Sequence, residues 1–364
     1  MKLALSLLAA LLPLTQGAGG RKPPASSKPA GGTWQTLAPI ADYPRQEHVT
    51  LALSETSIAV LCGIIPAANS TTSFETTNLL QIYDIPTNTW RTASPAPVRL
   101  NHPNAAVLNG TLYLLGGLTD AAVAAGGGRA WEAAPQAYQY DPATDAWTAL
   151  PGMPADGADT PRGSAAMAVD AWRGRIYLAG GLTRLPLGAG GERQETVDDV
   201  SVFDVRRRAW GRLPPAARRL PARRDHAGAA VVDGVLYVLG GRDRGQANVR
   251  GEVFALALDD KGLRKGWVTK KARMPTPRGG VAAAEVDGKV YVFGGEGNPA
   301  EGMEGMFTEV EVYDTRKDRW ERLPPMEVPR HGTSAVAVGG GVYVPGGGIR
   351  QSAAPVDVFN VFWP

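Results

Sequence analysis

An arginine recurs in the short loops that lead into the apolar segments of this sequence, and all four histidines lie in the same loops. Guanidinium groups bind carboxylate, sulfate and phosphate groups through paired hydrogen bonds. Several such loops around one opening would create a positive field that attracts anions. The sequence therefore predicts an anion-binding mouth. Its candidate residues are Arg45, His48, Arg99, His102, Arg162, Arg224, His226, Arg278, Arg330 and His331, with Arg242 from a later loop.

These leading loops allow two other interpretations. Pro-Arg pairs recur in them, so each arginine could instead hydrogen-bond a backbone carbonyl of a neighbouring structural unit. Histidine is the commonest transition-metal ligand, but these histidines are spread along the chain without a pair or a nearby carboxylate at metal-ligand spacing. We therefore expect packed histidines, no bound metal and no cofactor.

The stretch 278–324 indicates which elements must position the loops. Asp287-Gly288 stands between two apolar runs, and Asp-Gly in that setting is the strongest short-range signal for a β-hairpin. A second pair of alternating apolar runs follows Gly294-Gly295. The stretch therefore predicts four short antiparallel strands, which form one small sheet.

The same pattern recurs along the chain, which indicates a repeat architecture. The small-residue pair stands at Cys62-Gly63, Gly116-Gly117, Gly180-Gly181, Gly240-Gly241, Gly294-Gly295 and Gly346-Gly347. An aromatic-Asp pair follows in most copies, and six positions after its aspartate comes Trp90, Trp147, Trp210 or Trp320. A linear row of four-stranded sheets leaves its two end sheets without a neighbour, whereas a closed ring does not. Because the pattern occurs in six copies, we expect an all-β, six-bladed propeller.

The two ends of the repeat array are incomplete in complementary ways. The segment 33–39 reads as an outer strand with no inner strands before it, and the last copy, 331–362, lacks a fourth strand. We expect the N-terminal strand to complete the C-terminal blade. Strand, Gly-Gly, loop, aromatic-Asp and Trp-x-x-Leu-Pro together resemble the kelch repeat over 33–364. The chain is similar to secreted, fungal-type kelch propellers of the galactose oxidase-like superfamily.

The resemblance implies several functions. Intracellular kelch adaptors bind acidic peptides through arginines of the leading loops. Secreted sialic acid mutarotases carry a catalytic Glu and Arg in one blade, and Arg250 matches that Arg, whereas Arg242 stands where the family has its Glu. Glu296 of the next blade is the candidate substitute. Copper-radical oxidases need a Tyr-His pair and a cysteine in a leading loop, and here no His follows a Tyr and Cys62 ends a strand.

The first residues predict export. An apolar run follows Met1-Lys2, and small residues before position 18 favour a signal peptide over 1–17. The Pro- and Gly-rich stretch 18–32 predicts a disordered linker before a propeller over 33–364. Asn69 and Asn109 begin glycosylation sequons. The single cysteine excludes an internal disulfide.

These features favour a secreted, non-enzymatic binding module whose arginine-rich mouth holds an anionic glycan or an acidic protein partner. The net charge of +3 demands neither nucleic acid nor membrane, and we expect a monomer without membrane insertion. The alternative is a cofactor-free sugar mutarotase or epimerase that uses Arg250 and Glu296. The copper radical carbohydrate oxidase is disfavoured.

Overall fold

The computed structural model describes residues 32–68, 73–122, 129–154, 168–187 and 194–364. The predicted signal peptide (1–17), the predicted linker up to residue 31, the Asn69 sequon and Arg162 lie outside these described residues. Within them the regular secondary structure is almost entirely β-strand, as predicted.

The unit that follows Arg278 has the strands that its sequence predicts. Val286 ends one strand and pairs with Lys289, which begins the next. Asp287 and Gly288 have φ of 52° and 79°, as a tight turn between antiparallel strands requires. The sheet contains β20 (Ala282–Val286), β21 (Lys289–Phe293), β22 (Val310–Asp314) and β23 (Arg319–Leu323).

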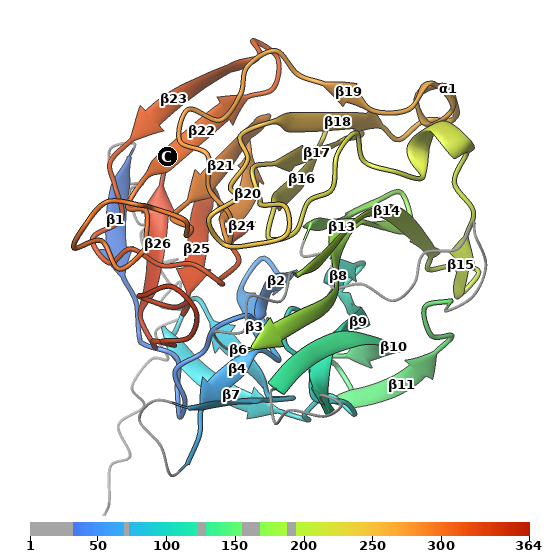
Figure 1. Ribbon diagram of the computed structural model, residues 1–364. Coiled ribbons are helices and arrows are strands. Elements are labelled where there is room, and N and C mark those ends of the chain that lie inside the picture. Colours follow the sequence, from blue (N-terminus) through green and yellow to red (C-terminus); the bar gives the residue numbers. More distant parts are fainter. Residues whose placement is uncertain (1–31, 69–72, 123–128, 155–167, 188–193) are drawn as a thin grey trace, which may run out of the picture.

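Three further sheets repeat this four-stranded antiparallel order. The first contains β2 (Val49–Ser54), β3 (Ser57–Leu61), β6 (Leu80–Asp84) and β7 (Thr89–Ala93). The second contains β16 (Gly228–Val232), β17 (Val235–Leu239), β18 (Val253–Ala257) and β19 (Val268–Thr269). The third contains β24 (Val336–Val338), β25 (Gly341–Pro345), β26 (Phe359–Trp363) and β1 (Thr33–Thr36). Figure 1 shows the sheets arranged around a common centre, as in a propeller.

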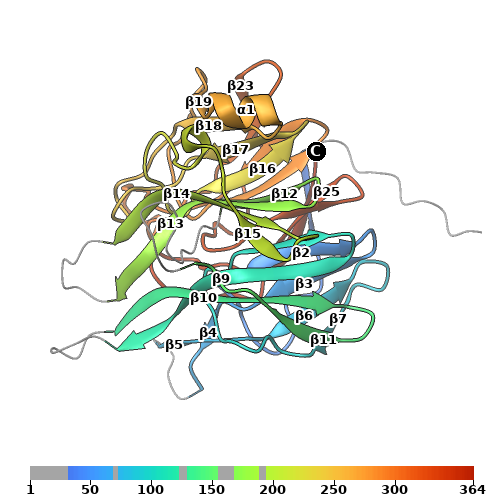
Figure 2. The same ribbon diagram turned by 90° about the vertical axis from the view of Figure 1, so that its right-hand side faces the viewer.

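The remaining large sheet has eight strands and contains two more four-stranded units. One unit is β8 (Ala105–Leu108), β9 (Thr111–Ala122), β10 (Arg129–Asp141) and β11 (Ala146–Leu150). The other is β12 (Ala168–Trp172), β13 (Arg175–Leu187), β14 (Glu195–Asp204) and β15 (Ala209–Gly211). The units join where Arg129 of β10 pairs with Leu187 of β13. These long strands project to one side of the ring (Figure 2), as does a short ribbon of β4 (Ile64–Pro66) and β5 (Phe74–Thr76).

The N-terminal strand completes the C-terminal sheet. Strand β1 pairs with β26 along its whole length, as the two incomplete ends of the repeat array predict. Apolar clusters fill the spaces between neighbouring sheets. One of them joins the first and last sheets, because Ile58 and Tyr83 pack against Tyr343 and Phe359.

The tryptophans of the repeat connect neighbouring units. The indole N–H of Trp90 donates to the carbonyl oxygen of Ala38 at 3.0 Å. Trp147 donates to the carbonyl oxygen of Ser94 at 2.9 Å. The equivalent bonds are made by Trp210, Trp267 and Trp320. This recurring spacing is therefore a device that holds one sheet against the next.

Helices are minor elements of the described residues. The 3-10 helix η1 (Pro215–Ala217) and the α-helix α1 (Asp260–Lys265) both lie in connections near the outer edge of the ring (Figure 1). The side chain of Asp259 caps α1 by accepting from the Gly262 N–H. Over the described ranges, no helix has the length and apolar character needed to cross a membrane.

Candidate functional site

Five leading loops that the structure describes each have one residue in the left-handed backbone conformation, with φ between 50° and 64°. We call these residues the mouth ring: Glu47, His102, His226, Gly280 and Gly332. Backbone hydrogen bonds of 2.6–3.1 Å connect them in the order His102, Glu47, Gly332, Gly280, His226. The loops therefore meet around one opening, where side chains from different sheets face one another.

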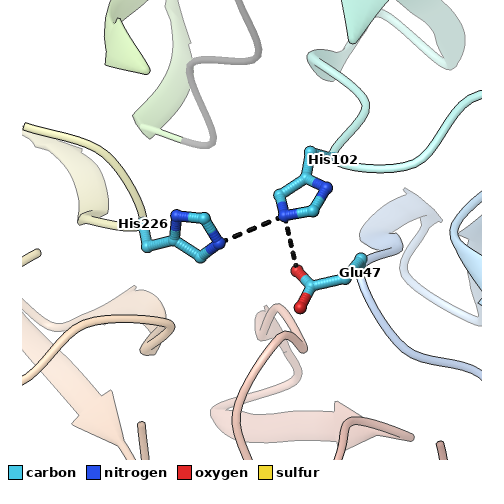
Figure 3. A group of neighbouring side chains, drawn as sticks. All are labelled: Glu47, His102 and His226. Atoms are coloured by element: carbon cyan, nitrogen blue, oxygen red, sulfur yellow. Dashed lines mark hydrogen bonds and ion pairs between the residues drawn. The ribbon is translucent and has the colours of Figure 1, made fainter. Parts of the chain in front are cut away.

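Three members of the mouth ring carry side chains, and these converge (Figure 3). His102 Nε2 lies 3.1 Å from Glu47 Oε2 and 3.1 Å from His226 Nε2. The ligating atoms of the three residues lie within 4.8 Å of one another. The expectation that the histidines remain scattered is thus wrong, because ring closure brings distant loops together.

The preceding residue orients each histidine of this trio. His102 Nδ1 lies 2.7 Å from Asn101 Oδ1, and His226 Nδ1 lies 2.7 Å from Asp225 Oδ1. A carboxylate only accepts hydrogen bonds, so His226 Nδ1 must carry the proton. With the Asn101 oxygen facing His102 Nδ1, the same holds for that ring. In the neutral imidazoles both Nε2 atoms then present lone pairs to the centre.

A third histidine stands at the edge of the trio. His331 Nδ1 lies 3.2 Å from the carbonyl oxygen of Gly348, so its Nε2 also faces inward as an acceptor. The Gln46 amide nitrogen lies 3.2 Å from this Nε2 and donates to Glu47 Oε1 at 3.1 Å. Glu296 Oε2 lies 3.6 Å from the same Nε2. The site is therefore a connected polar network.

Arg242 and Glu296 follow the Gly-Gly pairs of two neighbouring units and pair with their leading loops. Arg242 Nε donates to Asp225 Oδ1 at 2.7 Å, and its Nη2 lies 3.1 Å from His226 Nε2. Its Nη1 forms an ion pair with Glu296 Oε1. All four side chains are almost completely buried. Equivalent positions in the first two units hold Ile64 and Leu118, so this charge pair departs from the repeat.

Burial and charge shift the titration of the network in opposite directions. Burial lowers the pKa of His102 to about 3, so the ring is neutral near pH 7. Burial opposes ionisation of Glu47, whereas the hydrogen bond that the Gln46 amide donates to it favours the carboxylate and lowers its pKa. Burial would also lower the pKa of Arg242, but its carboxylate partners outweigh that effect and raise it.

A pocket of about 540 Å³ opens over this network. Its apolar wall is formed by Phe74, Trp131, Leu185, Pro186 and Leu187. Its polar floor is formed by Glu47, His102, His226, Arg242, Glu296 and His331. The Trp131 ring lies 5.4 Å from the His102 ring. The long strands β10 and β13 and the ribbon strand β5 supply most of the apolar wall, so the departures from the regular sheets build the pocket.

A family model for the KLHDC2/KLHL20/DRC7 Kelch-repeats domain matches residues 172–362, more than half of the chain. The chain belongs to the kelch-repeat family. A Kelch motif model matches residues 99–154, so the two kelch matches lie in different parts of the ring.

Curated kelch relatives extend this comparison. Kelch-like protein terF from Aspergillus terreus is 39% identical over 346 residues, which cover 94% of this chain and 70% of that protein. Kelch-like protein 34 from Homo sapiens is 31% identical over 265 residues, which cover 71% of this chain and 36% of that protein. N-acetylneuraminate epimerase 1 from Escherichia coli is 41% identical over 78 residues, 20% of this chain and 21% of that protein.

Three arginines of the predicted mouth serve their own sheets instead. Arg45, Arg278 and Arg330 are fully buried, and none lines the pocket. Arg278 donates to the Gly294 carbonyl oxygen at 2.7 Å and pairs with Glu311 at 2.5 Å. Burial lowers the pKa of Arg45 to about 10 and that of Arg330 to about 9. The prediction of a mouth lined by arginines is corrected here, because backbone carbonyls and a buried carboxylate of the same sheet bind these guanidiniums.

Three other predicted ligand residues also lie away from the pocket. Arg224 pairs with Glu252 at 2.5 Å, and Arg99 is exposed at the surface. His48 is buried with its Nε2 3.1 Å from the Pro345 carbonyl oxygen, and burial lowers its pKa to about 3. Of the predicted ligand residues that the structure describes, the pocket is lined by His102, His226, Arg242 and His331.

The predicted catalytic pair is separated. Glu296 lies in the pocket, whereas Arg250 is partly exposed and lies 3.9 Å from Asp243. Arg242 takes the place beside Glu296 that the sequence comparison gave to Arg250. A pairing of Glu296 with Arg250 is therefore corrected to one with Arg242.

Two further predictions concern single residues. Asn109 occupies an exposed turn with φ of 51°, so its sequon is accessible, and its glycosylation stays a prediction. Cys62 is buried, and burial raises its pKa to about 12.

Sequence reasoning missed Glu47, Asp225 and Trp131. Alignment of the leading loops on Gly280 and Gly332 would have placed Glu47 at the same position as the two central histidines. Trp131 carries no repeat signal, because it lies in the extension of β10 that the regular sheets lack.

Proposed function

We propose that this kelch chain forms a six-bladed ring, closed by β1, whose mouth pocket binds and transforms a small organic molecule. The observation that carries the proposal is the division of the pocket into an apolar, aromatic wall and a buried polar floor. Small-molecule sites commonly have this composition and a volume of roughly 300–1,000 Å³. A broad docking face would not need so many buried titratable groups.

The lining indicates the chemistry of the ligand. Trp131 and Phe74 lie 5.5 Å apart and offer aromatic surface to a planar or apolar part of a molecule. Arg244 is exposed at the pocket rim and has no ion-pair partner among the described residues. A guanidinium without an ion-pair partner can hold a carboxylate or another anionic group of a ligand. We therefore infer a ring-containing molecule with an acidic or oxygen-rich substituent.

Proton transfer is the reaction that the floor supports best. Glu296 and His331 are buried neighbours, and a carboxylate beside an imidazole can accept and return a proton. Arg242 fixes Glu296 and can stabilise negative charge on an oxygen of the substrate. This class includes the mutarotase or epimerase alternative, with Arg242 in place of Arg250. The similarity of one segment to N-acetylneuraminate epimerase 1 supports the same class.

Solvent isotope exchange tests this proposal. The protein would be incubated in D₂O with a library of cyclic acids, hydroxylated aromatic compounds and acidic sugars, and deuterium uptake followed by NMR. We expect deuterium uptake at carbon if the protein epimerises a compound that binds, and faster exchange between the anomers, without uptake at carbon, if it acts as a mutarotase. Glu296→Gln should abolish uptake while binding persists, and Glu321→Gln, an exposed carboxylate on β23, should leave uptake unchanged. Binding that survives Trp131→Ala unchanged would contradict the proposed pocket.

A second candidate is an anionic glycan or an acidic protein segment held at the mouth. The observation that favours it is a basic rim, because Arg223 and Arg250 are partly exposed around Asp243 near Arg244. Arg244→Ala should then abolish binding of acidic glycans or peptides, with Arg316→Ala on an outer turn as the control. This candidate would be favoured over the first if Arg244→Ala loses the large anionic ligands and the wild-type protein binds no compound of the small-molecule library.

We also infer that the chain is exported as a monomer. The predicted leader and the two sequons support export. Mass spectrometry of protein from the culture medium should find an N-terminus at Ala18, and light scattering should give the mass of one chain. A mature protein that retains Met1 inside the cell would contradict this part of the proposal.

A further inference from the structure

We propose that Glu47, His102 and His226 together bind one divalent transition-metal ion of the first row. The inference deepens the proposed function, because the ion would lie in the floor of the same pocket. No metal is needed for the proton transfer argued above, so the two proposals can fail separately.

The backbone conformation of the trio is the first support. Glu47, His102 and His226 hold φ of 53°, 50° and 54°, values that favour glycine. The other two members of the mouth ring, Gly280 and Gly332, are glycines. Glycine at this position is therefore sufficient for the fold. Strained non-glycine residues that point at one another indicate a function for their side chains.

The arrangement of lone pairs is the second support. The Nδ1 atoms of both histidines are engaged by Asn101 and Asp225, which leaves their Nε2 atoms as acceptors only 3.1 Å apart. Glu47 Oε2, an acceptor too, lies 3.1 Å from one of them. Ligands around a tetrahedral ion with bonds of ~2.0–2.1 Å stand roughly 3.3–3.4 Å apart. All three atoms lie within 4.8 Å of one another, and a cation between them would relieve their mutual repulsion.

An unsatisfied buried oxygen is the third support. Among the described residues, Glu47 Oε2 is buried and has no hydrogen-bond donor. The side chain of Glu47 is only 6% exposed, so water has little access to it. Buried carboxylate oxygens are normally paired, and one aimed at two imidazole lone pairs requires a cation or a shared proton.

The charges of the floor point the same way. The floor of the pocket holds three carboxyl groups, those of Glu47, Asp225 and Glu296, beside one guanidinium, that of Arg242, which pairs with Asp225 and Glu296, so acidic groups are in excess. A divalent cation balances this excess. Arg242 would compete with the ion for His226, because its Nη2 donates to His226 Nε2. Metal binding would replace that bond, while Asp225 and Glu296 continue to hold the guanidinium.

The donor set selects the kind of ion. Imidazole nitrogen and carboxylate oxygen suit Zn²⁺, Fe²⁺, Co²⁺ and Mn²⁺, whereas the hard ions Ca²⁺ and Mg²⁺ prefer oxygen ligands. The residues that hold the ring nitrogens, Asn101 and Asp225, match the outer partners that metal-bound histidines usually have.

Metal titration tests the site directly. Tag-free protein would be stripped with a chelator and titrated with Co²⁺ and then Zn²⁺, with visible absorbance and metal analysis as readouts. We expect one ion per chain, Co²⁺ absorption bands that Zn²⁺ displaces, and a higher melting temperature. His102→Gln should weaken binding at least tenfold. His48→Gln, a buried histidine away from the pocket, is the matched control and should bind like the wild type.

Glu47→Gln serves if His102→Gln does not fold, because the amide keeps the size of the side chain. Absence of stoichiometric Co²⁺ or Zn²⁺ binding, or binding that both variants retain, would overturn the metal site. Retention of a small molecule by the stripped protein would leave the proposed function intact in that case. Metal binding without any retained small molecule would instead support the site and count against the proposed function.

Discussion

Two positions in the same leading loops lie only two residues apart, but one side chain points into its own sheet and the other points into the shared opening. Arg45 and Arg224 bond within their own sheets, whereas Glu47 and His226 face the shared opening. The first position repeats with little change and secures each sheet. The second changes from glycine to a chemically active residue where side chains can meet. In this ring, conservation of the repeat marks the scaffold, and departure from it marks the pocket.

The largest expected effect concerns the scaffold position. Arg278→Ala leaves Glu311 buried without its guanidinium partner, so the free energy of unfolding should fall by roughly 3–5 kcal/mol. Urea denaturation would measure it. Arg319→Ala, which removes an exposed pair with Glu321, should cost about 1 kcal/mol or less. Normal stability with lost ligand binding in Arg278→Ala would reverse the assignment of the two positions.

Substitution of a mouth-ring glycine by alanine should lower stability for two reasons. A Cβ on Gly332 would meet the carboxylate of Glu47, and φ at this residue is 56°. Gly332→Ala should therefore destabilise the protein by about 2–4 kcal/mol and displace Glu47. Gly339 has nearly the same φ, 59°, with open space around its Cβ position, so Gly339→Ala isolates the backbone strain, about 1–2 kcal/mol. If the two variants lose equal free energy of unfolding, the contact between Gly332 and the Glu47 carboxylate would be contradicted.

A half-buried acid outside the mouth pocket should affect stability alone. Asp170 lines a second cavity of about 280 Å³ at the inner strands, and His102 borders both this cavity and the mouth pocket. Burial, with Glu285 nearby, raises the pKa of Asp170 from 3.8 to about 6. Between these pH values the folded state binds more protons, so the stability present below about pH 4 is lost as pH rises through 6. Because Asp170 is partly accessible, we expect about 1–2 kcal/mol.

Denaturation of wild type and Asp170→Ser between pH 4 and pH 7.5 measures this effect. The substitution should flatten that part of the profile and leave ligand and metal binding unchanged. A ligand defect in Asp170→Ser would extend the site beyond the mouth.

The smallest expected change in stability belongs to the mouth position. Glu47→Gly supplies the residue that two other members of the ring already have, so loss of strain and gain of chain flexibility should nearly cancel, within about 1 kcal/mol. The same variant should lose the bound Co²⁺. Thermal melting and Co²⁺ absorbance, measured on one preparation, check both outcomes. A large loss of stability would give Glu47 a role in the fold.

The sequence predicts the sheets well because their signals are local. Asp287-Gly288 fixes a hairpin, and the spaced tryptophans fix the contact between neighbouring sheets. The complementary ends of the chain also predict the pairing of β1 with β26.

The site was predicted only in part because it depends on contacts between distant loops. His102 and His226 are 124 residues apart, and their meeting depends on ring closure and on the left-handed backbone that turns each side chain inward. The sequence also does not show whether the guanidinium of Arg278 binds an external ligand or forms an ion pair with Glu311. That choice depends on which acceptors lie nearest in the folded ring.

Crystal structures of the protein soaked with Zn²⁺ and with the small-molecule library would test the central claim most directly. The account predicts an anomalous peak bounded by Glu47, His102 and His226, and ligand density against Trp131 in the same pocket. Ions and ligands found only at the outer surface, with water alone in the mouth pocket, would contradict it.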